Sequence, residues 1–172
     1  MLGDLTAPPL PDGTVDDYAT CAETYATFQV YHRSADPQFV SEVLKLTPTG
    51  TQVVGHEYLH RQTSRTKRYE ISGWFLRSKT FVQSFDSEKH LNWLLDQIAE
   101  KGLALSELQK AGWWMHISCF WDSQYGHGGP TFSPELLKRL AALGVEVWFD
   151  VYFDGAYRAM RDEAARHAWK GT

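Results

Sequence analysis

One stretch of the chain decides the fold: residues 113–153 read WWMHISCFWDSQYGHGGPTFSPELLKRLAALGVEVWFDVYF. Apolar residues occupy every second position from residue 113 to 121 and again from residue 145 to 153. This period of two is typical of a strand that buries one of its faces. The stretch therefore predicts two strands whose apolar faces lie against a common core.

A helix is predicted between these two strands. Ser133 is suited to cap free backbone N–H groups, and Pro134 is tolerated at the first helical position. Gly144 ends the helix, since glycine is favoured just past a helix C-terminus. The buried stripe of this helix is formed by leucines: Leu136, Leu137, Leu140 and Leu143. The whole stretch therefore predicts a β-α-β crossover.

The region before residue 113 shows the same sequence signals for strands and helix caps. Alternation from Thr24 to Tyr31 predicts a strand, and Asp36-Pro37 repeats the cap followed by proline. Residues 51–83 predict two strands joined by a polar, basic turn. A further helix is expected to begin near Asp86 and to stop at Gly102, with this apolar stripe: Leu91, Leu94, Leu95 and Ile98.

The predicted fold is a single two-layer α+β domain over residues 22–153. It has a mixed β-sheet with β-α-β units and helices on one face, in an arrangement similar to a ferredoxin-like fold. Residues 1–21 carry prolines and little periodicity, so they predict an extended N-terminal arm. Residues 154–172 predict a C-terminal helical tail.

Composition narrows the classes of function. The 172 residues include seven Trp, eight Tyr and nine Phe, more large rings than a core of this size readily hides, which favours a contact surface. A formal net charge of −4 excludes a protein that coats nucleic acid or an anionic membrane with its whole surface. Cys21 and Cys119 are too few and too far apart for a disulfide framework. With no long apolar run, we expect a cytoplasmic protein.

The polar positions of the three alternating strands predict a second, chemically mixed sheet face. A sheet with helices on one side and rings mixed with hydrogen-bonding groups on the other is suited to binding. The alternative is that the hairpin, the arm or a dimer partner covers this face. Its residues are Tyr25, Thr27, Gln29 and Tyr31; Trp114, His116, Ser118 and Phe120; and Glu146, Trp148, Asp150 and Tyr152.

A glycine-rich loop, GHGGP at residues 126–130, precedes the predicted helix. His127, Gly128 and Gly129 are candidate binding residues, because backbone N–H groups at a helix N-terminus can hold an anion. The simpler interpretation is a tight loop whose glycines adopt positive φ.

The string HEYLH at residues 56–60 matches the H-E-x-x-H pattern of zinc hydrolases. On a helix, His56 and His60 would share one side of a zinc ion, and Glu57 would activate water. The surrounding residues show no helical stripe, and on a strand Glu57 would point away from the histidines. Candidates for a third ligand are Glu70, Glu88 and His90.

Two further constellations carry weaker signals. His116, Ser118 and Asp150 can share the open face and so permit a base, a nucleophile and an orienting acid, but no nucleophile elbow supports them. A basic cluster gives the region 56–79 a charge of 6 − 2 = +4, and a hairpin that is solvated or docks onto an acidic protein explains it better than nucleic-acid binding. Its basic residues are Arg61, Arg65, Lys67, Arg68, Arg77 and Lys79.

Six short motifs give the chain a family resemblance. They are ETYATF (23–28), GWFL (73–76), LNWLL (91–95), SCFW (118–121), GHGGP (126–130) and SPELL (133–137). In this order they resemble the bacterial domain-of-unknown-function family 4279, over roughly residues 22–153. The resemblance implies a small bacterial α+β domain and no particular activity.

The functional hypothesis is non-catalytic recognition of another protein, such as inhibition of a toxin or enzyme by an immunity protein. It uses the open face and the glycine-rich loop, with no catalytic residue and no cofactor. Two alternatives stay open: a zinc-dependent hydrolase built on His56, Glu57 and His60, and a binder of anionic small ligands or nucleotides near Gly128 and the basic hairpin. A homodimer is also compatible with the sequence, whereas a membrane or nucleic-acid partner is not expected.

Overall fold

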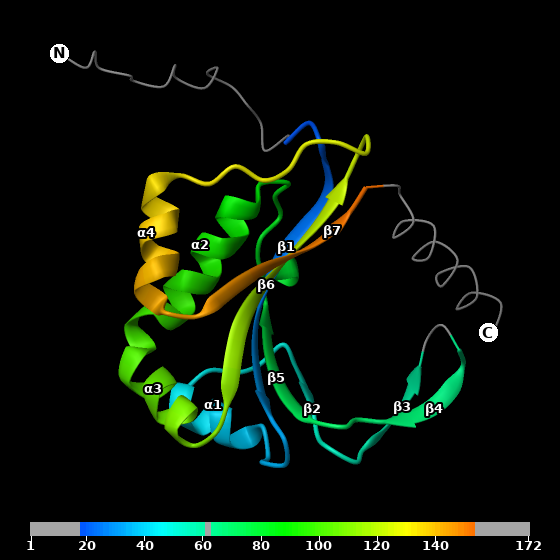
Figure 1. Cartoon of the computed structure of the whole chain (residues 1–172), viewed down its shortest axis with the longest axis vertical. Coiled ribbons are helices and arrows are strands. Elements are labelled where there is room, and N and C mark those ends of the chain that lie inside the picture. The colour runs from blue at the N-terminus through cyan, green and yellow to red at the C-terminus, as the bar shows by residue number, and fades with distance from the viewer. Residues whose placement is uncertain (1–17, 61–62, 154–172) are drawn as a thin grey trace.

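The computed structural model of the chain describes residues 18–60 and 63–153 (Figure 1). The arm expected over residues 1–21 lies outside this part except for its last residues, and the tail expected over 154–172 lies entirely outside it. In chain order the elements are β1 (Cys21–His32), α1 (Gln38–Leu44), β2 (Gly50–Gln52), β3 (Glu57–His60), β4 (Arg65–Arg68), β5 (Ser72–Arg77), η1 (Ser78–Thr80), α2 (Ser87–Ile98), η2 (Ala99–Lys101), α3 (Gly102–Lys110), β6 (Trp114–Ser123), α4 (Pro134–Leu143) and β7 (Glu146–Tyr152).

The main sheet has the strand order β2-β5-β1-β6-β7. β1 is its centre and pairs antiparallel with β5 and β6. β7 runs parallel to β6, so β6-α4-β7 is the predicted crossover. β2 is antiparallel to β5, as β1 is, and therefore runs parallel to β1 with β5 between them. The chain thus forms a mixed sheet with two β-α-β units, which confirms the predicted fold class.

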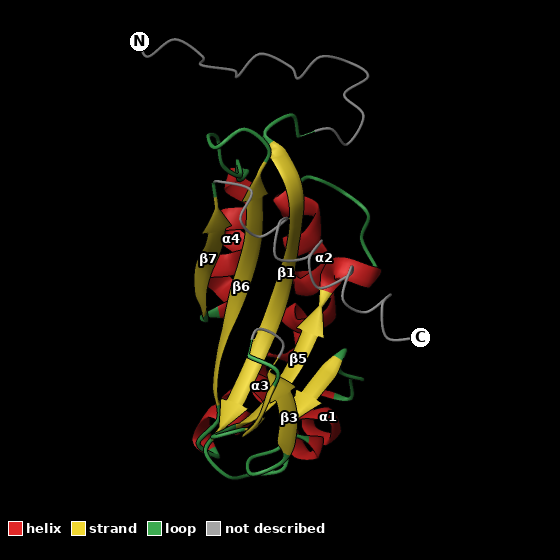
Figure 2. Ribbon diagram, turned by 90° about the vertical axis from the view of Figure 1, so that its right-hand side faces the viewer, coloured by secondary structure: helices red, strands yellow, loops and turns green. Residues whose placement is uncertain are grey.

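The helices α1, α2, α3 and α4 cover one face of this sheet (Figure 2). The apolar positions of the alternating strands point into that layer and form one core with the helices. Ala26, Phe28 and Val30 on β1 are fully buried there. Trp74 on β5 is also fully buried, and its indole N–H donates to Ser41 Oγ of α1 over 2.9 Å. The opposite side of the sheet, here called the outer face, carries the other set of side chains.

The region 51–83 forms four strands rather than the predicted two. The first arm is broken by a turn between β2 and β3, in which Gly55 has a φ of +80° and donates its N–H to the Tyr69 carbonyl. A glycine tolerates this conformation at little cost. β3 and β4 therefore leave the main sheet and form a separate two-stranded hairpin that projects from the body (Figure 1).

The starts of α2 and α4 and the end of α4 follow the sequence signals. The Asp86 side chain accepts from the Glu88 N–H at the start of α2, and Ser133 accepts from the Leu136 N–H at the start of α4. Gly144 ends α4 with a φ of +69°. Gly102, expected to stop the preceding helix, has right-handed helical angles and begins α3 instead.

Ser78 continues the hydrogen bonding of β1 beyond the end of β5. Its hydroxyl accepts from the Ala26 N–H over 2.9 Å and lies 2.7 Å from His90 Nδ1. His90 Nε2 in turn lies 3.0 Å from the Ser84 carbonyl, to which its N–H donates. Ser78 and His90 are both buried, so this hydroxyl ties the sheet centre to α2 where no backbone partner is available.

Replacing Ser78→Ala is expected to lower the free energy of unfolding by about 1–3 kcal/mol, because the buried Ala26 N–H loses its partner. Urea denaturation of the variant and the wild-type protein measures the difference. Ser106→Ala, on the exposed side of α3, is the matched control and should change stability by less than about 0.5 kcal/mol. Equal effects of the two substitutions would show that the Ser78 hydroxyl has no special role.

Candidate functional site

The outer face is organised as rows of side chains that lie across the strands. Residues opposite one another in neighbouring strands point to the same side of a sheet, so the strand register fixes these rows. They are Tyr31 with Trp114; Phe75 with Gln29, His116 and Glu146; Arg77 with Thr27, Ser118 and Trp148; and Tyr25 with Phe120 and Asp150.

Four rings gather at one part of this face, here called the aromatic surface: Tyr31, Trp114, His116 and Trp148. Tyr31 is stacked on Trp114 with ring centroids 5.9 Å apart and lies 5.7 Å from His116. His116 meets Trp148 edge to face at 6.1 Å. Trp114 is 42% exposed and Trp148 is 45% exposed. The structure therefore brings these four predicted residues together and leaves both tryptophans accessible.

Gln29 holds the polar groups of this surface in place. Its side-chain carbonyl oxygen lies 2.7 Å from His116 Nε2 and accepts from the Tyr31 hydroxyl over 3.2 Å. Its amide nitrogen donates to Ser118 Oγ over 3.0 Å. Because the carbonyl oxygen is only an acceptor, His116 carries its proton on Nε2. One glutamine thus fixes the orientation of two rings and a hydroxyl.

The environment keeps His116 neutral. Burial lowers the pKa of His116 below its ordinary value, and the nearby Glu146 carboxylate opposes that shift without reversing it. Burial also raises the pKa of Tyr31, so its phenol stays protonated and donates to Gln29. The aromatic surface therefore presents uncharged groups to a partner near neutral pH.

A second ring cluster lies further along the outer face. Tyr25 is stacked on Phe120 at 4.7 Å, and Tyr152 lies 5.4 Å from Phe120. Arg77 and Lys79 lie over the Tyr25 ring at 5.3 and 5.0 Å. Tyr152 and Asp150, both predicted as binding residues, are only partly exposed in this region. The cluster is more enclosed than the aromatic surface.

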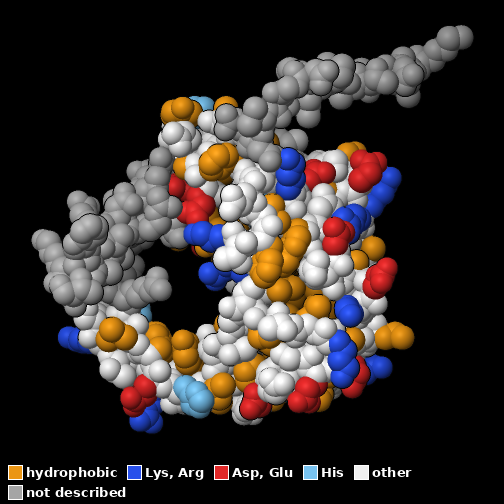
Figure 3. All heavy atoms as spheres, turned by 180° about the vertical axis from the view of Figure 1, so that it is seen from behind, with side chains coloured by type: hydrophobic (Ala, Val, Ile, Leu, Met, Phe, Trp, Pro, Cys, Tyr) orange, Lys and Arg blue, Asp and Glu red, His pale blue; other side chains and the backbone are white. Residues whose placement is uncertain are grey.

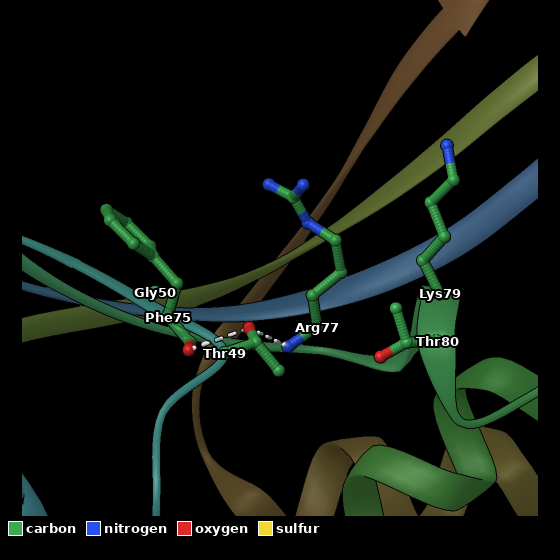
Figure 4. Close-up of a pocket in the computed structure, with 6 residues that line it drawn as sticks. All are labelled: Thr49, Gly50, Phe75, Arg77, Lys79 and Thr80. Carbon is green, nitrogen blue, oxygen red and sulfur yellow. Dashed lines mark hydrogen bonds between the residues drawn. The ribbon is translucent and has the colours of Figure 1, made fainter.

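A hollow of about 250 Å³ adjoins this cluster beside β5 (Figure 4). Arg77 and Lys79 extend in the same direction from it, and the Phe75 ring lies next to them (Figure 4). Lys79 is paired with the Glu23 carboxylate, whereas the Arg77 side chain contacts the Thr27 hydroxyl and the Tyr25 ring. Within the described part of the chain no carboxylate forms an ion pair with Arg77. The space-filling view shows a hollow between the body and the hairpin, with basic side chains at its border (Figure 3).

The glycine-rich loop lies apart from the aromatic surface. The loop follows the end of β6, whereas Trp114 begins that strand. The length of β6 therefore separates the loop from Trp114 by about 30 Å. Gly126 and Gly128 have φ values of +75° and +83°. A Cβ on Gly128 would lie 2.6 Å from Thr20 Oγ1. Glycine therefore suits this position both by its positive φ and by its close contact with Thr20. His127 and Gly129 are exposed but do not join the four rings.

The N-terminus of α4, considered as an anion site, is filled by the chain itself. The Glu88 carboxylate of α2 accepts from the Ser133 backbone N–H and from the Ser133 hydroxyl, each over 2.7 Å. Ser133 in turn accepts from the Leu136 N–H. An internal carboxylate therefore takes the position proposed for an external anion, because a helix N-terminus attracts negative charge.

The HEYLH string does not have the geometry of a zinc site. Glu57 to His60 form strand β3, and His56 precedes it. Two residues four apart on a strand are separated by about 13 Å, too far for both imidazoles to bind one ion. His60 Nδ1 lies 3.1 Å from Thr63 Oγ1. Among the described residues no three His, Cys, Asp or Glu side chains form a group suited to a metal.

The candidate catalytic groups are not arranged as a nucleophile and base. Gln29 lies between His116 and Ser118 and bonds to both. Burial raises the pKa of Cys119 to about 11 and that of Cys21 to about 12, so both thiols stay protonated near neutral pH.

The sequence did not indicate Phe75 or the central role of Gln29, and it indicated Arg77 only as part of the basic cluster. Trp74 and Leu76 are the buried positions of β5, so Phe75 and Arg77, which alternate with them, face outward. That alternation was the available signal. Which strands lie beside β5 was not visible, so Phe75 could not be placed 5.5 Å from Tyr31.

The fold and the site define a two-layer α+β domain with an exposed aromatic surface on the sheet face that the helices of the described residues do not cover. Residues 22–154 match the profile of a domain of unknown function, DUF4279, and the chain belongs to that family. No curated protein and no solved structure matches the chain. Within the described residues, no helix has the length and apolar character needed to span a membrane.

Replacing His116→Gln is expected to change how stability depends on pH. The pKa of folded His116 lies below its ordinary value of 6.5, so the unfolded chain takes up the proton first. The contribution of neutral His116 to the free energy of unfolding is fully present above about pH 6.5. It is lost as the pH falls from there toward the pKa of the folded state. Glutamine keeps an amide donor for Gln29 and does not titrate.

Urea denaturation of both proteins between about pH 8 and pH 5 measures this effect. The difference in free energy of unfolding should be constant at the upper end and move in favour of His116→Gln as the pH falls below about 6.5. A difference that stays constant over the whole range would contradict the assignment of His116 as a neutral group.

Proposed function

We propose that this protein recognises another protein, without catalysis, through the aromatic surface on its outer face. The observation that carries the proposal is the pair of half-exposed tryptophans, Trp114 and Trp148, on either side of His116. Tryptophan and tyrosine are enriched among the residues that dominate binding energy at protein interfaces. Their hydration is unfavourable in the free protein, so covering them stabilises a complex.

The order of this surface supports a binding role. Gln29 already fixes Tyr31, His116 and Ser118 by hydrogen bonds in the free chain. Side chains that are held in place before binding lose less conformational entropy when a complex forms. The groups with acid-base character are engaged in this network, which favours recognition over chemistry.

The chemistry of the surface suggests what the partner presents. The aromatic surface is uncharged and suits an apolar segment, whereas Arg77 lies in the same cross-strand row as Trp148. A carboxylate beside that apolar segment would complete the contacts of the Arg77 guanidinium with an ion pair. An inhibitor or immunity protein that covers such a segment on a toxin or enzyme fits this arrangement.

Truncating either tryptophan, as Trp114→Ala or Trp148→Ala, is expected to weaken partner binding by at least about 30-fold, the effect of losing about 2 kcal/mol at an interface. The partner is first captured from the native cell with the tagged wild-type chain and identified by mass spectrometry. Its dissociation constant for each variant is then measured by calorimetry.

Leu103→Ala is the matched control, because Leu103 is 91% exposed on α3 in the helix layer. It should bind the captured protein as the wild-type chain does. Thermal unfolding confirms that each variant is folded. If the variant with both tryptophans truncated binds the same protein with unchanged affinity, the aromatic surface is not the recognition site.

A further inference from the structure

Strand β7 is an edge strand with an unusual degree of apolar exposure. Within the described residues it pairs with β6 on one side, and no strand adjoins its other side. Trp148 is 45% exposed on the outer face, and Phe149 and Val151 are each 37% exposed on the face that carries the helices. An edge of this kind offers a row of backbone N–H and C=O groups and apolar side chains on both faces.

The opposite edge of the sheet is built differently. β2 has three residues, Gly50–Gln52, and its short length limits what can pair with it. β7 has seven residues, Glu146–Tyr152, and contains no lysine or proline that would discourage pairing. Proteins commonly protect a free edge by shortness, proline or charged side chains, especially lysine, and of these β7 has only the carboxylates of Glu146 and Asp150. This contrast indicates that the free edge of β7 pairs with another strand in the functional protein.

We propose that β7 pairs antiparallel with β7 of a second copy of this chain, about a two-fold axis through Phe149. Side chains directly opposite in an antiparallel pair lie on the same side of the sheet. Each residue of β7 must therefore lie opposite a β7 residue of the second copy whose side chain points to the same side of the sheet. Because side chains alternate along a strand, the two-fold axis must pass through a residue and not between two residues. Phe149 is the middle residue of β7, so only this register pairs the strand along its full length.

The charges agree with this register and disfavour the axes at the two neighbouring residues, Trp148 and Asp150. With the axis at Phe149, Glu146 lies opposite Tyr152 of the second copy, and Trp148 lies opposite Asp150 of the second copy. No two carboxylates are then opposed. An axis through Trp148 would oppose Glu146 and Asp150, and an axis through Asp150 would oppose two aspartates. Like charges directly opposite one another destabilise a strand pair. Isologous pairing of this kind is the common arrangement in two-fold dimers.

The apolar side chains are also complementary in this register. On the helix side of the sheet, Val147 faces Val151 of the second copy, and the two Phe149 rings meet at the axis. These contacts cover Phe149 and Val151, which are exposed in the single chain. The two main sheets become one continuous sheet, and both outer faces lie on the same side of it. This pairing does not depend on whether the aromatic surface binds a protein.

Light scattering coupled to size exclusion tests the association of the full-length chain. The expected result is a concentration-dependent mass that approaches twice the 19.7 kDa of one chain. Leu59→Lys, on the exposed hairpin strand β3 away from β7, should leave the dimer intact. Val151→Lys should shift the equilibrium to monomer at the same concentration. A monomer mass up to the solubility limit of the wild-type protein would overturn the proposal.

Cysteine substitution tests the register. Opposed residues in an antiparallel pair have Cα atoms about 4.5–5.5 Å apart, within the range that a disulfide spans. Phe149→Cys should therefore form a disulfide-linked dimer on mild oxidation, and Val151→Cys should not, because its two copies lie about 13 Å apart. Cys21 and Cys119 are buried and do not interfere.

Mixing Val147→Cys with Val151→Cys provides an independent check in case Phe149→Cys does not fold. The mixture should cross-link to a dimer, and each variant alone should not. Mass spectrometry of the linked peptides identifies the two positions. Cross-linking of Val151→Cys alone to the same extent as the mixture, or no cross-linking in any of these proteins, would overturn the proposed register.

Discussion

The central strand β1 is the constraint on which the rest of the structure depends. It pairs with β6 on one side and, from Thr27 to His32, with β5 on the other, and beyond the end of β5 the Ser78 hydroxyl accepts from the Ala26 N–H. Its alternate side chains are then committed to opposite layers: Ala26, Phe28 and Val30 enter the helix layer, and the intervening residues line the outer face. Because the four α-helices within residues 18–60 and 63–153 lie on one side, they leave the other side of the sheet to form a surface (Figure 2).

That surface combines two properties that usually conflict. It exposes large rings, which favours contact with a partner, and it fixes them through buried or half-buried polar contacts, which keeps the surface ordered. Gln29 provides both acceptor and donor for its neighbours, and its position on β1 places it between β5 and β6. Elsewhere the chain satisfies its own charges, as Glu88 does at the N-terminus of α4.

The parts of the fold that local signals determine were predictable. The alternation in residues 113–121 and 145–153 and the Ser133-Pro134 cap gave β6, α4 and β7, since each signal involves neighbours in the chain. Residues 51–83 were predicted as two strands, whereas they form four, because the break between β2 and β3 depends on the turn at Gly55 and on pairing between distant residues. Likewise, Gly102 can adopt helical angles, and packing rather than composition decided that it begins α3.

The sequence by itself determined which side chains share a face of each strand, because a period of two is a property of the local backbone. It thereby placed Tyr31, Trp114, His116 and Trp148 on polar faces. Only the tertiary structure decided that β5 and β6 flank β1, which brings Phe75, Gln29 and His116 into one row. It also separated the glycine-rich loop from the rings and stretched the HEYLH string along a strand. Strand order follows from the packing of distant segments into one core, and no local pattern encodes it.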